Sequence, residues 1–111
     1  MSKQSIGDGI RVDHLYFYTG FPYGVTGDWG VERQIRTVLD KLGEELRKAE
    51  SSLENVVKAT VYLVNLDDRE RYLDPLWEEY FGKDEGPVRC TIQAWLSPPA
   101  MVEIEFIAYV P

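Results

Sequence analysis

Cysteine and histidine are almost missing from this 111-residue chain, which has one of each, Cys90 and His14. One cysteine cannot form a disulfide within the chain, and one histidine excludes a catalytic histidine pair and a multi-histidine metal site. A single thiol suits a protein that works in a reducing compartment. We therefore expect no metal site, a buried Cys90 that serves packing, a structural His14 within a strand, and a cytoplasmic location.

Basic residues and long apolar runs are also scarce. The chain has 12 Lys and Arg against 19 Asp and Glu, and its net charge of −7 repels nucleic acid and anionic lipid at long range. It has no apolar run of about 18 residues, no secretory pattern in residues 1–9, and no glycine-rich nucleotide-binding motif. We expect no nucleic-acid partner, no membrane partner and no cofactor.

What is present suffices for one domain, because 44% of the 111 residues are hydrophobic. Apolar spacings of three and four predict helices, whereas alternation and β-branched residues predict strands. The order is β-β-α-β-α-β-β, in which the first segment is one long strand or two short ones. The predicted segments are residues 10–19 (strand), 31–48 (helix), 56–64 (strand), 73–81 (helix), 88–95 (strand) and 101–110 (strand).

The first helix is strongly amphipathic, and Asp28 is positioned to cap its N-terminus. Gly43 is unfavourable inside a helix, which predicts a close backbone contact there. The predicted core stripe is Val31, Ile35, Val38, Leu39, Leu42 and Leu46. The predicted solvated face carries Glu32, Arg33, Arg36, Asp40, Lys41, Glu44, Glu45 and Lys48.

Two helices that each bury one apolar stripe fit an α+β fold in which both cover the same face of a sheet. Alternation assigns Val57, Ala59, Val61 and Leu63 to the core side, and likewise Val88, Cys90, Ile92 and Ala94. The opposite face mixes polar and apolar groups, which predicts a closed homo-oligomer with clefts between subunits. That face is predicted to carry Thr60, Tyr62, Arg89, Thr91, Gln93, Trp95, Glu103, Glu105, Ile107 and Tyr109.

Five blocks in series make the chain resemble the RidA/YjgF family, whose members are also described as L-PSP endoribonucleases. These blocks are ERQIRTVLDKLGEEL, SSLENVVKATVYLVNLDD, WEEYF, PVRCTI and VEIEFIA, with a proline two residues before Arg89. The resemblance implies that residues 1–111 form a single chorismate-mutase-like domain. It also implies a homotrimer with a barrel core, ligand clefts between subunits, and hydrolysis of small 2-imino or 2-enamino acids to a 2-oxo acid and ammonia.

The family's arginine, which binds the substrate carboxylate, matches Arg89, and the glutamate that positions or activates water matches Glu103. A planar guanidinium suits a carboxylate, although an arginine paired to Glu103 or Glu105 for cohesion is the structural alternative. In a tight hairpin of the last two strands, Glu103 lies opposite Gln93, so contact with Arg89 needs another pairing or a neighbouring subunit. The other family positions that contact ligand match Thr19, Gly20, Asp74 and Thr91.

The chain departs from the family at residues 6, 74 and 91. Ile6 stands where the family has a ligand-contacting tyrosine, and the candidates to replace it are Tyr16, Tyr18 and Tyr23. Asp74 replaces an asparagine, and Thr91 replaces a cysteine found in some members. The departures at residues 6 and 74 leave a non-catalytic carboxylate-binding or sensing module as an alternative to a deaminase. An endoribonuclease or translation inhibitor is the third hypothesis, against which the charge of −7 argues.

Overall fold

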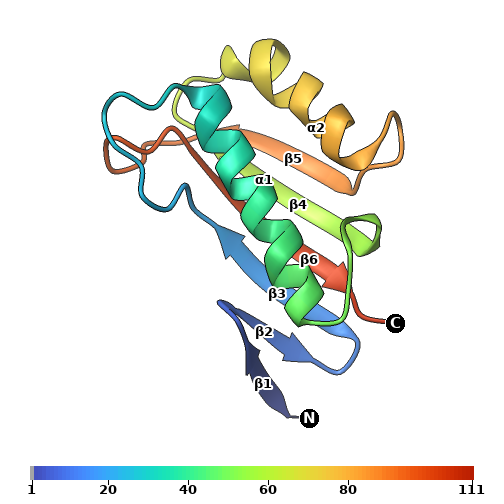
Figure 1. Ribbon diagram of the computed structural model, residues 1–111. Helices are drawn as coiled ribbons and strands as arrows, with labels where there is room; N and C mark the ends of the chain where they lie inside the picture. The colour runs from blue at the N-terminus through green and yellow to red at the C-terminus, as the bar shows by residue number, and fades with distance from the viewer. Residues whose placement is uncertain (1) are drawn as a thin grey trace.

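The computed structural model describes residues 2–111 and shows a six-stranded sheet with two α-helices on one face (Figure 1). The predicted α+β architecture is therefore confirmed. The elements are β1 (Lys3–Ile6), β2 (Gly9–Val12), β3 (Leu15–Gly20), α1 (Val31–Lys48), β4 (Val56–Leu63), α2 (Asp74–Phe81), β5 (Val88–Gln93) and β6 (Val102–Tyr109). A short 3₁₀ turn, Leu53–Asn55, precedes β4, and a π-helical turn, Arg69–Leu73, runs directly into α2.

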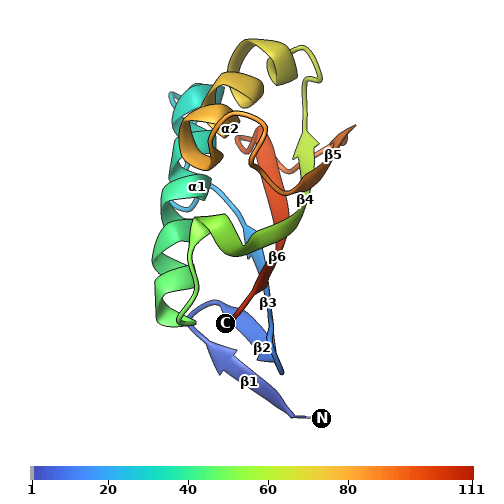
Figure 2. The same cartoon turned by 90° about the vertical axis from the view of Figure 1, so that its right-hand side faces the viewer.

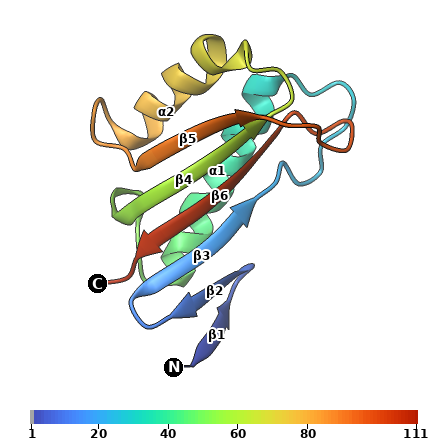
Figure 3. The same ribbon diagram turned by 180° about the vertical axis from the view of Figure 1, so that it is seen from behind.

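The strands lie in the order β1-β2-β3-β6-β4-β5. The β4–β5 pair is parallel, and every other neighbouring pair is antiparallel. A parallel pair needs a crossover, and α2 provides it. Both helices lie on one side of the sheet, as Figure 2 shows edge-on, and the opposite face is uncovered in Figure 3. The last two strands do not form the expected hairpin, because β4 lies between them.

The N-terminal segment contains one strand more than the sequence predicts. Residues 10–19 divide into β2 and β3, joined by a turn in which Asp13 has φ 53° and which also contains His14, so His14 is not a strand residue. The additional strand, β1, pairs with β2 from Lys3↔Val12 to Ile6↔Gly9. Its sequence, KQSI, has no apolar alternation and is largely exposed, so no burial pattern marked it as a strand.

The core lies between α1, α2 and the covered face of the sheet. All six predicted stripe residues of α1 are buried, and they share one core with alternate residues of β6, from Val102 to Ala108, and with Val110 just after the strand. The apolar face predicted for β6 is therefore confirmed. No helix in residues 2–111 combines the length and apolar character needed to cross a bilayer.

Three local predictions for α1 are wrong. The N-cap is Gly30, because the Asp28 carboxylate instead accepts a hydrogen bond from the Thr26 hydroxyl, which lowers the pKa of Asp28. A Cβ at Gly43 would meet no atom within 4 Å, so no close contact requires a glycine there. Glu45, which the pattern assigns to the solvated face, is completely buried.

The alternation of β5 has the opposite sense to the predicted one. Val88 and Ile92 are 69% and 42% exposed, and Cys90 is also exposed, so these residues lie on the uncovered face. The parallel register pairs Arg89 with the buried Ala59, which turns Arg89 toward the helices. In β4, a bulge between Val56 and Lys58 leaves Val57 48% exposed instead of in the core.

Replacement of Gly43 by alanine should stabilise the protein by about 0.5–1 kcal/mol, because alanine has the higher helix propensity and its methyl group enters open space. Urea unfolding at a fixed protein concentration, monitored by circular dichroism, measures the change. A destabilised Gly43→Ala variant would show that the glycine has a structural role after all.

Candidate functional site

Arg89 lies at the edge of the sheet, where β5 runs beside α2. Its Nη2 donates a hydrogen bond to Oδ1 of Asp74 at 2.5 Å, and its guanidinium lies 5.1 Å from the ring centroid of Trp77. The side chain of Arg89 is 19% exposed and that of Asp74 is 46% exposed. The guanidinium is thus oriented by an aromatic face and one carboxylate, yet it keeps access to solvent.

The local sequence explains why these three side chains meet. Asp74 and Pro75 open α2, where a carboxylate is favourable near the helix N-terminus and a proline is tolerated. Trp77 follows Asp74 by three residues and therefore lies on the same side of the helix. Pro87 precedes β5, and Arg89 is the second residue of that strand. Thr91 follows on the same side of β5 as Arg89.

Glu103 lies on the other face of the sheet from Arg89. It pairs with Tyr62 of β4, which pairs in turn with Ile92 of β5, so the three residues form a row across the uncovered face. Because β4 separates β5 from β6, the two predicted catalytic residues do not meet within one chain. The cohesive pairing of Arg89 to Glu103 or Glu105 is likewise not formed, since the carboxylate partner of Arg89 is Asp74.

Glu103 and Thr19 line one hollow of about 550 Å³ in the uncovered part of the molecule. The hollow is also lined by Phe21 and Tyr23, and its rim on another side is the segment Asp8–Ile10 at the start of β2. Gly20, the neighbour of Thr19 at the end of β3, faces α1 instead, because a Cβ there would crowd Val38. The structure therefore places Glu103 and Thr19 at this hollow and Arg89, Asp74 and Thr91 at the β5 edge, whereas Gly20 lies at neither.

The three tyrosines considered as substitutes for the family tyrosine differ in their surroundings. Tyr16 is buried and donates its hydroxyl hydrogen to the Ile6 carbonyl at 2.8 Å, and burial raises its pKa to about 12. Tyr18 is also buried, and burial raises its pKa. Tyr23 is 51% exposed and lines the hollow with Glu103, so it is the tyrosine with an accessible hydroxyl.

The row next to Glu103 contains a second carboxylate. Glu105 lies between Thr19 and Thr60 in the sheet register, and its Oε1 accepts a hydrogen bond from the Tyr62 hydroxyl at 2.5 Å, which raises the pKa of Tyr62. A smaller hollow of about 240 Å³ lies beside it, lined by Thr19, Lys58 and Thr60 among others. Sequence alternation predicts Glu105 on this face, and the structure confirms it. The hydrogen bond from Tyr62 could not be predicted, because it depends on the register of β4 with β6.

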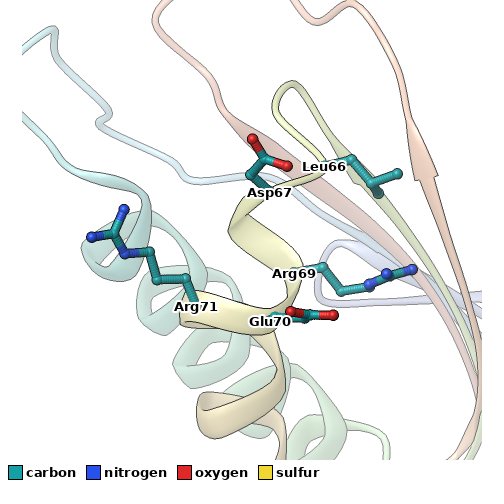
Figure 4. Close-up of a pocket in the computed structure, with 5 residues that line it drawn as sticks. All are labelled: Leu66, Asp67, Arg69, Glu70 and Arg71. Carbon is teal, nitrogen blue, oxygen red and sulfur yellow. The ribbon is translucent and has the colours of Figure 1, made fainter.

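Within residues 2–111 no group of three or more His, Cys, Asp or Glu side chains could hold a metal ion. A hollow of about 530 Å³ lies at the π-helical turn before α2, and Figure 4 shows that its side chains spread in different directions instead of converging on one point. Those side chains belong to Leu66, Asp67, Arg69, Glu70 and Arg71.

Comparison with known proteins gives consistent matches. A family model described as "Endoribonuclease L-PSP" matches residues 6–110. YoaB of Escherichia coli, a RutC family protein, is 30% identical over 104 residues, which cover 93% of this chain and 89% of YoaB. A RutC family protein of Synechocystis is 35% identical over 88 residues, which cover 78% of this chain and 67% of that protein.

Solved structures agree with the sequence matches. A protein of unknown function from Yersinia pestis, of the conserved Rid protein family, superposes with a TM-score of 0.82 at 27% identity, covering 96% of this chain and 90% of that one. A YjgF family member from Neisseria meningitidis superposes with a TM-score of 0.86, covering 100% of this chain and 97% of the other. At 22% identity the second likeness concerns the fold alone.

The half-exposed Asp74 should contribute little to stability through its ion pair with Arg89. Exposed pairs are worth about 0.2–1 kcal/mol, and asparagine can still accept the hydrogen bond. Urea unfolding of Asp74→Asn should therefore give a free energy of unfolding within about 1 kcal/mol of the wild-type value. A much larger loss would indicate that the pair exists to hold α2 to β5.

Proposed function

Because this chain belongs to the endoribonuclease L-PSP family, which is also called RidA/YjgF, we propose that it is a hydrolytic deaminase of small 2-imino and 2-enamino acids. The products are a 2-oxo acid and ammonia. The observation that carries the proposal is the guanidinium of Arg89, which is oriented by Asp74 and Trp77 and remains accessible at the sheet edge. Such a group suits a small organic acid.

Arg89 binds the substrate carboxylate in this proposal. A guanidinium has five N–H donors in a planar fork, and Asp74 accepts from only one nitrogen, Nη2. The side chain of Arg89 is 19% exposed, which places a permanent positive charge in a partly dry site that solvent still reaches. Thr91, on the same side of β5, adds a hydroxyl to this half of the site.

The second half of the site is the hollow that contains Glu103 and Thr19. Since these residues lie away from Arg89 in one chain, we propose that the complete cleft forms between subunits, from the β5 edge of one and the hollow of the next. The uncovered sheet face supports association, because it exposes large apolar side chains that a monomer would leave in water. They include Leu15, Phe17, Val88, Ile92 and Tyr109. A barrel-cored homotrimer, as the family resemblance implies, buries this face.

The chemistry is addition of water followed by loss of ammonia. Glu103 orients a water molecule and accepts a proton from it as the oxygen adds to the carbon of the protonated imine, which gives a neutral carbinolamine. Glu103 then returns this proton to the nitrogen and takes up the hydroxyl proton as the C=O bond forms and the C–N bond breaks, so that ammonia and the 2-oxo acid are released. A 2-enamino acid enters the same steps after tautomerising to the imine. Neither step changes the overall oxidation state, so the proposal involves no cofactor. Alignment of the substrate acid against this water contributes to the rate.

Thr19, Gly20, Tyr23 and Asp74 complete the proposed site. The Thr19 hydroxyl and the Tyr23 hydroxyl supply polar contacts in the hollow, with Tyr23 in place of the missing family tyrosine at Ile6. Gly20 ends β3 beside Thr19 and contributes backbone. Asp74 competes with the substrate carboxylate for Arg89, so its charge tunes affinity. We place the protein in the cytoplasm, where one unpaired thiol stays reduced.

Asp74 favours a second candidate function, a sensing module that binds a small carboxylate without turnover. The Asp74 carboxylate forms an ion pair with the Arg89 guanidinium, at a position where the family has a neutral amide. Calorimetry with 2-oxo acids that shows binding, together with an unchanged rate of imine decay, would favour this function over the deaminase. RNA cleavage is disfavoured, because a net charge of −7 opposes the approach of a polyanion.

Replacement of Arg89 by alanine should lower kcat/KM for an imine generated by an amino-acid oxidase roughly 10- to 150-fold, because charge-assisted hydrogen bonds of about 1.5–3 kcal/mol are lost. Arg89→Lys should be intermediate, since it keeps the charge and loses the fork. The decay of the imine is followed by its capture with semicarbazide.

Arg36→Ala is the matched control for this variant. Arg36 is a half-exposed arginine of α1 that pairs with Glu79 of α2, and it contacts neither Asp74 nor the hollow that contains Glu103. It should keep wild-type activity. If folded wild-type protein leaves the decay of several amino-acid-derived imines unchanged, the deaminase proposal is wrong.

Sedimentation analysis should give a mass of three chains for the wild type and of one chain for Ile92→Glu. The new carboxylate would stand on the uncovered face in the row of Tyr62 and Glu103, where burial of a third acidic or polar group without a partner is costly. Thr37→Glu, which adds the same charge on α1, should leave the mass unchanged. A monomeric wild type would contradict the proposed assembly.

A further inference from the structure

The turn between β1 and β2 forms a wall of the hollow that contains Glu103. Asp8, Gly9 and Ile10 line it together with Thr19 and Tyr23. The β1–β2 hairpin joins the remaining sheet through only three residue pairs between β2 and β3, of which Ile10↔Phe17 is nearest the hollow. The position of this wall therefore depends on contacts made outside the sheet.

Glu45 of α1 makes the principal contact of this kind. Its Oε2 accepts a hydrogen bond from the backbone N–H of Asp8 at 2.7 Å, and its side chain is 0% exposed. Its Oε1 lies 2.9 Å from Nζ of Lys48 and 3.3 Å from Nζ of Lys41. Two cations on the helix thus hold the carboxylate in place, and the carboxylate holds the main chain of the turn.

The shape of the turn is fitted to this carboxylate. Gly7 has φ 58°, and a Cβ at this position would collide with the carboxylate of Glu45. On the other side of the turn, a Cβ at Gly9 would collide with the Tyr16 hydroxyl, which itself holds the Ile6 carbonyl. The turn therefore has little freedom to move toward or away from α1 while Glu45 is in place.

We propose that Glu45 is a positioning residue for the site, because by fixing the Asp8–Ile10 wall it sets the size of the substrate side chain that the hollow accepts. This inference rests on the proposed function. Glu45 touches neither substrate nor the reacting atoms, and it acts through the turn. The hollow offers apolar surface from Ile10, Phe21 and Tyr23, so the quantity it controls is the fit of an apolar side chain.

Glu45→Gln is the direct test. The amide can still accept the Asp8 N–H, but it presents an NH₂ group to the ammonium groups of Lys41 and Lys48, which only donate. The turn should loosen while Arg89 and Glu103 stay unchanged. For imines derived from alanine and phenylalanine, we expect roughly a tenfold change in the ratio of their kcat/KM values, carried by KM of the larger substrate. The kcat of the alanine-derived imine should stay at the wild-type value.

Hydrogen exchange at the Asp8 amide reports independently on the turn and should accelerate in Glu45→Gln. Lys48→Gln removes the nearer of the two cations that hold the Glu45 carboxylate and should change the same substrate ratio, so it decides the question if Glu45→Gln does not fold. Glu79→Gln removes a surface carboxylate from a pair with Arg36 and is the control, with an unchanged ratio. Faster exchange at Asp8 with an unchanged substrate ratio would overturn the inference, as would an equal shift in Glu79→Gln.

Failure of the proposed function gives a different result. If the wild type does not deaminate, the same variants are compared by calorimetry with pyruvate and phenylpyruvate. An altered affinity ratio in Glu45→Gln would then support the positioning role in a binding module. Absence of binding to both acids would overturn the inference together with the proposed function. Wild-type deamination combined with an unaltered substrate ratio would overturn the inference alone.

Discussion

The hydrogen bonding of β6 to β3 on one side and to β4 on the other is the constraint on which the rest of the structure depends. It fixes which residues of each strand face the helices, and thereby builds the core from Val102 to Val110. It also sends Glu103 and Glu105 to the uncovered face. Because β4 must then lie between β6 and β5, the carboxylate of Glu103 and the guanidinium of Arg89 are separated within a chain. The separation of these two predicted site residues within one chain follows from the strand order itself.

The sequence predicts correctly the helices and strands whose apolar residues recur with a regular period. The stripe of α1 and the alternation of β6 each bury a continuous apolar face, so the sequence pattern alone predicts which of their residues are in the core. β1 is a polar strand at the sheet edge, and its existence depends on pairing with β2 and not on burial. β5 alternates correctly but with the opposite sense, since an edge strand takes its orientation from the register with its single neighbour, β4. Its apolar row, Val88, Cys90 and Ile92, belongs to the uncovered face.

The candidate site likewise contains residues that a sequence motif identifies and one residue whose burial depends on a segment far away in the sequence. Arg89, Thr19 and Asp74 could be named from motifs, and the contact of Asp74 with Arg89 gives a physical meaning to a departure from the family pattern. Glu45 could not be found in this way. It sits in a helix among exposed charges, and only the approach of the β1–β2 turn buries it. The one sequence signal was Gly7 next to Asp8, a typical turn pair, which says nothing about the helix beneath it.

The position of β5 at the edge of the sheet affects how the protein avoids aggregation. Along residues 88–93 the main chain is hydrogen-bonded to β4 alone, so one row of its amide and carbonyl groups faces outward. A bare margin of this kind invites unwanted strand pairing and aggregation. Arg89 places a charge there, which discourages such pairing, and any partner that shelters the margin must leave room for the guanidinium. The charge that discourages strand pairing at this edge is thus the same charge that binds the carboxylate in the proposed function.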